Sequence, residues 1–137
     1  MKFIQPQENN NNFLIAYKLK GSEIECPKTK TIRATQKLLD CWEELRVSID
    51  EPIIINSGFR TIAYHIELYR RKFPDTWKDK ITTHSAHLTG EALDMKVPLE
   101  METEKFMEEC KKAGFTYVYD ITGKSRGGDV HADVKRR

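Results

Sequence analysis

The chain has 137 residues, of which 39% are apolar and 32% are charged. This length and balance indicate one globular domain and exclude a chain that is disordered over most of its length. The 23 basic and 21 acidic residues leave a formal net charge of +2. So small a charge does not favour nucleic acid or a membrane surface as the main partner.

No stretch of the sequence approaches the roughly 20 consecutive apolar residues of a membrane span. The N-terminal stretch lacks the continuous hydrophobic segment of a secretion signal. Cys26, Cys41 and Cys110 are odd in number and widely spaced. This spacing favours buried, reduced thiols over disulfides or a paired-cysteine zinc site. We therefore expect synthesis in the cytoplasm, with any target outside the cell reached after release.

Taken in chain order, residues 1–30 predict an N-terminal arm or loop region that includes the polar stretch QENNNN at 7–12. The core is expected over 31–137. Residues 31–47 predict an amphipathic helix, because apolar side chains recur there at helical spacing: Ala34, Leu38, Cys41, Trp42 and Leu45. A β-branched run at 52–56 predicts a short strand, and helical periodicity returns over 62–73.

The second half of the chain predicts one more helix and three strands. The helix covers about 101–113 and ends before Gly114. Strands are expected at 92–97, 115–120 and 129–135, where side chains alternate in character and therefore point to opposite faces. Helices placed before and between these strands favour an α+β fold, with a small antiparallel sheet and flanking helices.

Two of these strands carry metal-binding residue types on their polar faces. Asp94 lies on the polar face of the strand at 92–97, and His131 lies on that of the last strand. His87 precedes Asp94, and Gly90 between them permits a left-handed turn. If the two strands pair, these side chains supply the three ligands of a catalytic zinc site. The other interpretation is a polar turn that leads into an ordinary strand.

The segment SAHLTGEALD at 85–94 spells S-x-H-x-x-G-x-A-x-D. This motif resembles the signature of the zinc D-alanyl-D-alanine carboxypeptidases. That family also includes vancomycin-resistance dipeptidases, phage L-alanyl-D-glutamate endolysins and the metal-binding fold of hedgehog signalling domains. INSGFRT at 55–61 is similar to the family's S-G-Y-R-S element, and VHADVK at 130–135 is similar to its closing H-x-D element.

The resemblance implies a hedgehog/D,D-peptidase-like fold and a zinc ion (Zn2+) bound by His87, Asp94 and His131. It also implies that Arg60 holds the substrate through a carboxylate, because a guanidinium pairs with a carboxylate in a bidentate way. Ser85 falls at a position that contacts the substrate or supports the site. The family's glycine pair is absent from residues 70–83, which indicates that this rim of the site recognises a different group.

The general base departs from the family pattern. Relatives carry an acid three positions before the last metal histidine, or a histidine two positions before it. Here these positions hold Gly128 and Asp129. Residues two apart on a strand share a face and lie roughly 6.6 Å apart, so Asp129 is the predicted base. Asp133 is expected to orient His131 instead.

The sequence therefore predicts a monomeric zinc peptidase that hydrolyses an amide bond in a peptidoglycan-type peptide and acts on the cell wall after release. A D-Ala-D-Ala terminus, an L-Ala-D-Glu link and a cross-bridge all remain open as the bond that is cut. The alternative is a catalytically weak or inactive zinc-containing binding or structural module of the same fold, which Gly128 in place of an acid makes relevant. The closing VKRR is expected to be a solvated terminus.

Overall fold

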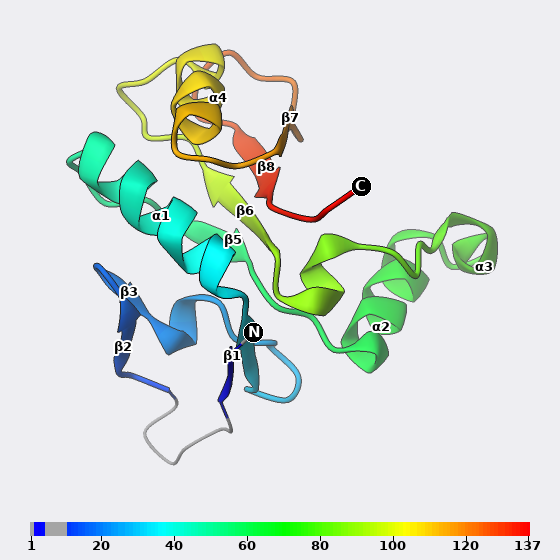
Figure 1. Cartoon of the computed structure of the whole chain (residues 1–137). Coiled ribbons are helices and arrows are strands. Elements are labelled where there is room, and N and C mark those ends of the chain that lie inside the picture. The colour runs from blue at the N-terminus through cyan, green and yellow to red at the C-terminus, as the bar shows by residue number, and fades with distance from the viewer. Residues whose placement is uncertain (1, 5–10) are drawn as a thin grey trace.

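The computed structural model describes residues 2–4 and 11–137. Apart from Asn11 and Asn12, the predicted polar stretch at 7–12 lies outside these residues. Figure 1 shows a central sheet with helices around it, and two small sheets formed by the N-terminal part of the chain. The predicted α+β class, with a small antiparallel sheet and flanking helices, is confirmed.

The central sheet has four antiparallel strands in the order β5-β6-β8-β7. Their bounds are β5 Ile55–Ser57, β6 Ala92–Lys96, β7 Tyr117–Asp120 and β8 Asp129–Asp133. The four strands predicted at 52–56, 92–97, 115–120 and 129–135 are thus present, with ends shifted by a few residues. The predicted pairing of the strands at 92–97 and 129–135 is confirmed, and it places Asp94 directly opposite His131.

The helices are α1 Gln36–Ser48, α2 Ile62–Lys72, α3 Trp77–Lys80 and α4 Thr103–Lys112, with short 3-10 helices η1 Gly21–Glu23 and η2 Ala86–Thr89. The two small sheets pair β1 Lys2–Ile4 with β4 Ile32–Ala34, and β2 Leu14–Ala16 with β3 Leu19–Lys20. The prediction that a helix begins at residue 31 is wrong. Residues 32–34 pair with β1, and α1 begins after Thr35, whose Oγ1 accepts a hydrogen bond from the Leu38 N–H at 3.2 Å.

The hydrophobic core lies between one face of the sheet and helices α1 and α4, which Figure 1 shows next to the sheet and apart from α2 and α3. Leu93, Met95, Val130 and Ala132 are all buried there. Because side chains alternate along a strand, the same two strands turn Asp94 and His131 to the opposite face. The packing of the core therefore fixes where the polar residues point.

The predicted boundary between an arm at 1–30 and a core at 31–137 stays a prediction. Within the described part of the arm, Leu19 and Ile24 are almost fully buried and belong to the same hydrophobic core. The three cysteines are buried and free, as predicted. Among the helices of the described residues, none is long and apolar enough to cross a membrane.

Gly90 connects η2 to β6 in the loop that carries His87, and its backbone passes close to the backbone of Arg33. Its φ of +72° lies in the left-handed region, and its carbonyl accepts a hydrogen bond from the Thr35 N–H at 3.0 Å. A Cβ at this position would lie 2.5 Å from the Arg33 carbonyl oxygen, so the backbone of residue 33 excludes any side chain.

We predict that Gly90→Ala lowers the free energy of unfolding by more than about 2 kcal/mol, because it adds a backbone clash to an unfavourable φ. Gly123→Ala is the matched control. Its φ is +71°, but nothing lies within 4 Å of the added Cβ, so it reports the conformational cost of about 1 kcal/mol alone. Chemical denaturation measures both values. Equal losses would show that the close approach of Arg33 has no energetic effect.

Candidate metal centre

Three side chains from three elements converge on one point. His87 comes from η2, Asp94 from β6 and His131 from β8, and their ligand atoms all lie within 4.8 Å of one another. Asp94 Oδ1 lies 3.2 Å from His87 Nε2 and 2.9 Å from His131 Nδ1. The group could therefore hold a metal ion.

The backbone of Gly58 fixes the ring of His87. Because a carbonyl oxygen can only accept, His87 Nδ1 carries a proton and donates it to the Gly58 carbonyl at 2.7 Å. The neutral ring then has its lone pair on Nε2, the atom that faces Asp94. The His87 side chain is buried, so it has little freedom to turn this lone pair away.

A chain of two hydrogen-bonded partners fixes the ring of His131. Its Nε2 lies 2.6 Å from Asp133 Oδ2, and Arg137 donates to both oxygens of that carboxylate at 2.8 and 3.1 Å. The Arg137 guanidinium also lies over the Tyr117 ring, 4.2 Å from its centroid. With Nε2–H directed at Asp133, the lone pair of neutral His131 is on Nδ1, towards Asp94.

The charges of the site are tightly coupled. Burial by itself would raise the pKa of Asp94, but the hydrogen bonds that the His131 and His87 rings donate when they carry a proton on both nitrogens hold it far below its usual range. Burial would also raise the pKa of Asp133, yet hydrogen bonds from His131 and Arg137 lower it to about 2. Burial disfavours protonated His131, but the carboxylates of Asp133 and Asp94 raise its pKa overall. Two carboxylates thus remain ionised beside the rings.

The donor set and its spacing fit zinc. Metal–ligand bonds of about 2.0–2.1 Å in a tetrahedron put neighbouring ligand atoms about 3.3 Å apart. The two separations measured from Asp94 Oδ1, 3.2 and 2.9 Å, are close to this edge length. Two imidazole nitrogens and one carboxylate oxygen also match catalytic zinc sites, which use three protein ligands. The identity of the ion is taken up below as a proposal.

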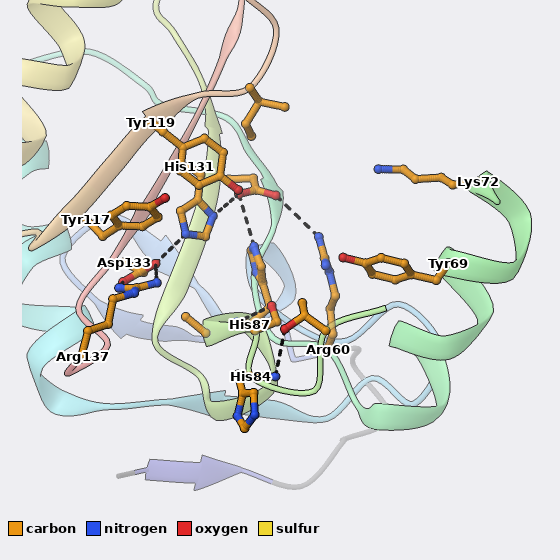
Figure 2. A pocket seen from close by; sticks show the side chains of 15 residues that line it. Arg60, Tyr69, Lys72, His84, His87, Tyr117, Tyr119, His131, Asp133 and Arg137 are labelled. Carbon is orange, nitrogen blue, oxygen red and sulfur yellow. Dashed lines mark hydrogen bonds and ion pairs between the residues drawn. The ribbon is translucent and has the colours of Figure 1, made fainter. Parts of the chain in front are cut away.

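These three residues line an open cavity of about 450 Å³ (Figure 2). Tyr117 and Tyr119 of β7 stand on one side of it, and Tyr69 and Lys72 of α2 stand on the other. The Tyr119 ring stacks on His131, with 4.6 Å between the ring centroids. The cavity therefore joins a set of polar ligands to aromatic walls, an arrangement that suits a bound peptide.

Arg60 and Ser85, both predicted to contact substrate, also line this cavity. Arg60 donates from Nε to Ser57 Oγ at 3.2 Å, and its terminal nitrogen lies 3.6 Å from Asp94 Oδ2. Ser85 caps η2, since its Oγ accepts a hydrogen bond from the His87 N–H at 3.3 Å. Arg60 thus faces the centre directly, whereas Ser85 holds the turn that carries His87.

Asp129, the predicted general base, lies on β8 two residues before His131 and is partly buried. Its Oδ1 accepts a hydrogen bond from Asn56 Nδ2 at 2.8 Å. Asp129 does not line the cavity, in contrast to Asp133. The structure thus brings His87, Asp94, His131, Arg60 and Ser85 together and leaves Asp129 beside them.

The other two histidines of the chain lie in different surroundings. His84 lines the cavity, whereas His65 is buried elsewhere and its Nε2 donates to the Thr82 carbonyl at 2.8 Å. The predicted solvated VKRR terminus is exposed at Arg136 and Arg137, although Arg137 also pairs with Asp133 and Val134 is buried. Tyr117 and Tyr119 were not predicted as site residues. Their alternation on a strand was the available signal, but it did not show which strand would lie beside His131.

Comparisons with known proteins add a distant likeness. No protein-family model matches the chain, and no curated protein matches it. Among solved structures, the chain is similar to the crystal structure of the Serratia marcescens L-Ala D-Glu endopeptidase ChiX, with a TM-score of 0.45 and 17% sequence identity. The likeness covers 74% of this chain and 80% of that one.

We predict that Asp133→Asn lowers zinc affinity by about 10- to 100-fold, because the carboxylate that orients His131 and increases its basicity is lost. Asp75→Asn, on the exposed rim, removes the same charge far from the ligands and serves as the control. Competition with a chromophoric chelator measures the affinity, and circular dichroism verifies that both variants fold. Equal affinities in the folded variants would exclude an orienting role for Asp133.

The pH dependence of metal binding follows from the raised pKa of His131. A metal must displace the proton from Nδ1, so affinity falls as the pH is lowered through this pKa. The fall should begin above 6.5, the ordinary value for histidine. In Asp133→Asn the pKa of His131 is expected to drop, and the affinity curve should move to lower pH. Identical curves for the two proteins would contradict the coupling of His131 to Asp133.

Proposed function

We propose that this protein is a zinc peptidase of the D,D-peptidase-like fold that hydrolyses an amide bond in a peptidoglycan-type peptide. The observation that carries the proposal is the convergence of His87, Asp94 and His131 at a cavity that Arg60 also lines. The three ordered motifs of the sequence support the same assignment. A monomer that reaches the cell wall after release is part of the proposal.

Zinc bound at such a site lowers the pKa of a coordinated water towards about 7 and polarises the scissile carbonyl. The protein contributes the positions of the reacting groups. Hydrogen bonds to Gly58 and Asp133 hold the two imidazoles with their free nitrogens on the same side. Tyr117 and Tyr119 supply an apolar wall against which a peptide chain can lie.

In this proposal Arg60 binds the substrate through a carboxylate. The Arg60 side chain is only 16% exposed, so an anion paired with it is largely shielded from water. Its Nε is held by Ser57. Because the guanidinium is planar and rigid, this hydrogen bond also fixes the direction of the terminal nitrogens, which a substrate carboxylate can approach from the cavity. Ser85 contributes by holding the η2 turn, and by the position of its hydroxyl group in the cavity wall.

Asp129 is proposed to accept the proton of the attacking water and to deliver it to the leaving amine. Its position on the same strand face as His131, roughly 6.6 Å away along the strand, supports the role. Its hydrogen bond from the neutral Asn56 amide leaves the carboxylate without a cationic partner among the described residues.

A second candidate function is a zinc-containing binding or structural module. The observation that favours it is the place of Asp129, which lies outside the cavity lining, together with Gly128 where an acid would be expected. Such a module would keep the metal and the cavity but would not turn over substrate. The two candidates differ in catalysis alone, because metal removal should destabilise the fold in both cases.

Mass analysis of peptidoglycan fragments digested with the zinc-loaded protein tests the proposal. We expect new amino termini and a single type of cleaved bond, which also identifies the bond. His87→Ala and His131→Ala should abolish zinc binding and cleavage together, because each removes one of three ligands. Full activity in either variant would exclude the metal assignment.

Asp129→Asn tests whether Asp129 is the general base of a peptidase. It keeps an oxygen that can accept from Asn56, so the fold and the zinc affinity should be retained while the rate falls by about 100-fold or more. Asp79→Asn on α3 is a control for the lost surface charge. Stoichiometric zinc with no cleavage by the unmodified protein would instead establish the binding module.

A further inference from the structure

Several cationic side chains line the cavity, and they differ in whether an acidic side chain neutralises them. The arginine and lysine side chains that line it are Arg60, Lys72 and Arg137, and the only acids in its lining are Asp94 and Asp133. Asp133 is taken by His131 and Arg137, and Asp94 by the two histidines and Arg60. Both acids are therefore occupied inside the site, and neither is left to neutralise Lys72.

The three consecutive cations at the end of α2 show the contrast. Arg70 lies over the Trp77 ring, 4.6 Å from its centroid, and Arg71 pairs with Glu67 at 3.6 Å. Lys72 forms no hydrogen bond, ion pair or ring contact with any residue that the structure describes. Its two neighbours have structural partners, whereas Lys72 extends from the end of α2 towards the cavity on the same side as Tyr69 (Figure 2).

Tyr69 lies on the same wall of the cavity as Lys72. Its ring packs between His65 and Phe73, with centroid distances of 4.8 and 6.1 Å. Residues three apart on a helix share a face, so Tyr69 and Lys72 both face the cavity from α2. Arg60 lies deeper, beside Asp94, whereas Lys72 is exposed at the rim. The cavity thus presents two cationic positions at different depths.

We propose that Lys72 determines substrate specificity by binding a second carboxylate of the peptide, at the rim, while Arg60 binds the first one deeper in the cavity. This inference rests on the proposed function and narrows its substrate class to peptides with two free carboxylates. An ammonium is a compact charge on a flexible stem, and it suits a carboxylate that is partly solvated. The bidentate guanidinium is kept for the buried position.

Four synthetic stem peptides of one sequence test the proposal. The α-carboxyl group of the internal glutamyl residue is either a free acid or an amide. The C-terminal carboxyl group is likewise either a free acid or an amide, which gives the four combinations. The unmodified protein should prefer the peptide with both acids. Lys72→Gln should raise KM for that peptide by about three- to fivefold, as expected for a solvent-accessible ion pair. At one of the two carboxyl positions the variant should no longer prefer a free acid to an amide, whereas at the other position it should keep this preference.

Arg71→Gln is the matched control. It removes the same charge from the same helix turn, including any effect on the helix dipole, but it does not line the cavity. Its acid-to-amide preferences should equal those of the unmodified protein. If Lys72→Gln keeps both preferences, or if Arg71→Gln loses one as well, the specific role of Lys72 is overturned.

The outcomes also separate this inference from the proposed function. If the unmodified protein cleaves none of the peptides, the peptidase proposal fails. Calorimetry of the same four peptides with the zinc-loaded protein then tests whether Lys72 binds a carboxylate. Tighter binding of a free acid that is lost in Lys72→Gln alone would support it. Equal affinities of Lys72→Gln and the unmodified protein for all four peptides would overturn it.

Discussion

The antiparallel pairing of β6 with β8 is the constraint on which the site depends. Its register sets Asp94 directly opposite His131 and Leu93 opposite Ala132. The pair of Leu93 and Ala132 lies in the core, and the pair of Asp94 and His131 lies on the polar face. A shift by one residue would reverse both, burying Asp94 and exposing Leu93. The hydrophobic core under α1 and α4 therefore also enforces the geometry of the ligands, although none of its residues touches the site.

Each histidine is held from the side away from the metal position. His87 donates to a backbone carbonyl, and His131 donates to a carboxylate that Arg137 secures in turn. The two supports differ in kind, because a carbonyl is neutral and fixed by the fold, whereas Asp133 brings a charge. The Asp133 side chain is completely buried, so its charge is strongly felt by His131. The carboxylates of Asp133 and Asp94 raise the pKa of His131, so substitution of Asp133 should change the metal affinity through this ring.

Local pattern predicted much of this arrangement. Alternation showed the faces of both strands, and the resemblance of the motifs to a zinc peptidase family implied His87, Asp94 and His131 as ligands. It could not show residues whose role depends on distant contacts. Arg137 pairs with Asp133 only because the chain turns back after β8, and Lys72 faces the cavity only because α2 packs beside η2. The start of α1 was missed because pairing with β1 overrides the helical spacing of residues 32–34.

The central claim is that two imidazoles and one carboxylate form a zinc site with room for a further ligand. X-ray absorption at the zinc edge of the loaded protein tests it most directly. The predicted result is one zinc per chain with two imidazole nitrogens and oxygen ligands at about 2.0–2.2 Å. A sulfur ligand at about 2.3 Å would contradict the claim, since it would place the metal on a cysteine instead. Failure to bind zinc at one equivalent would contradict it as well.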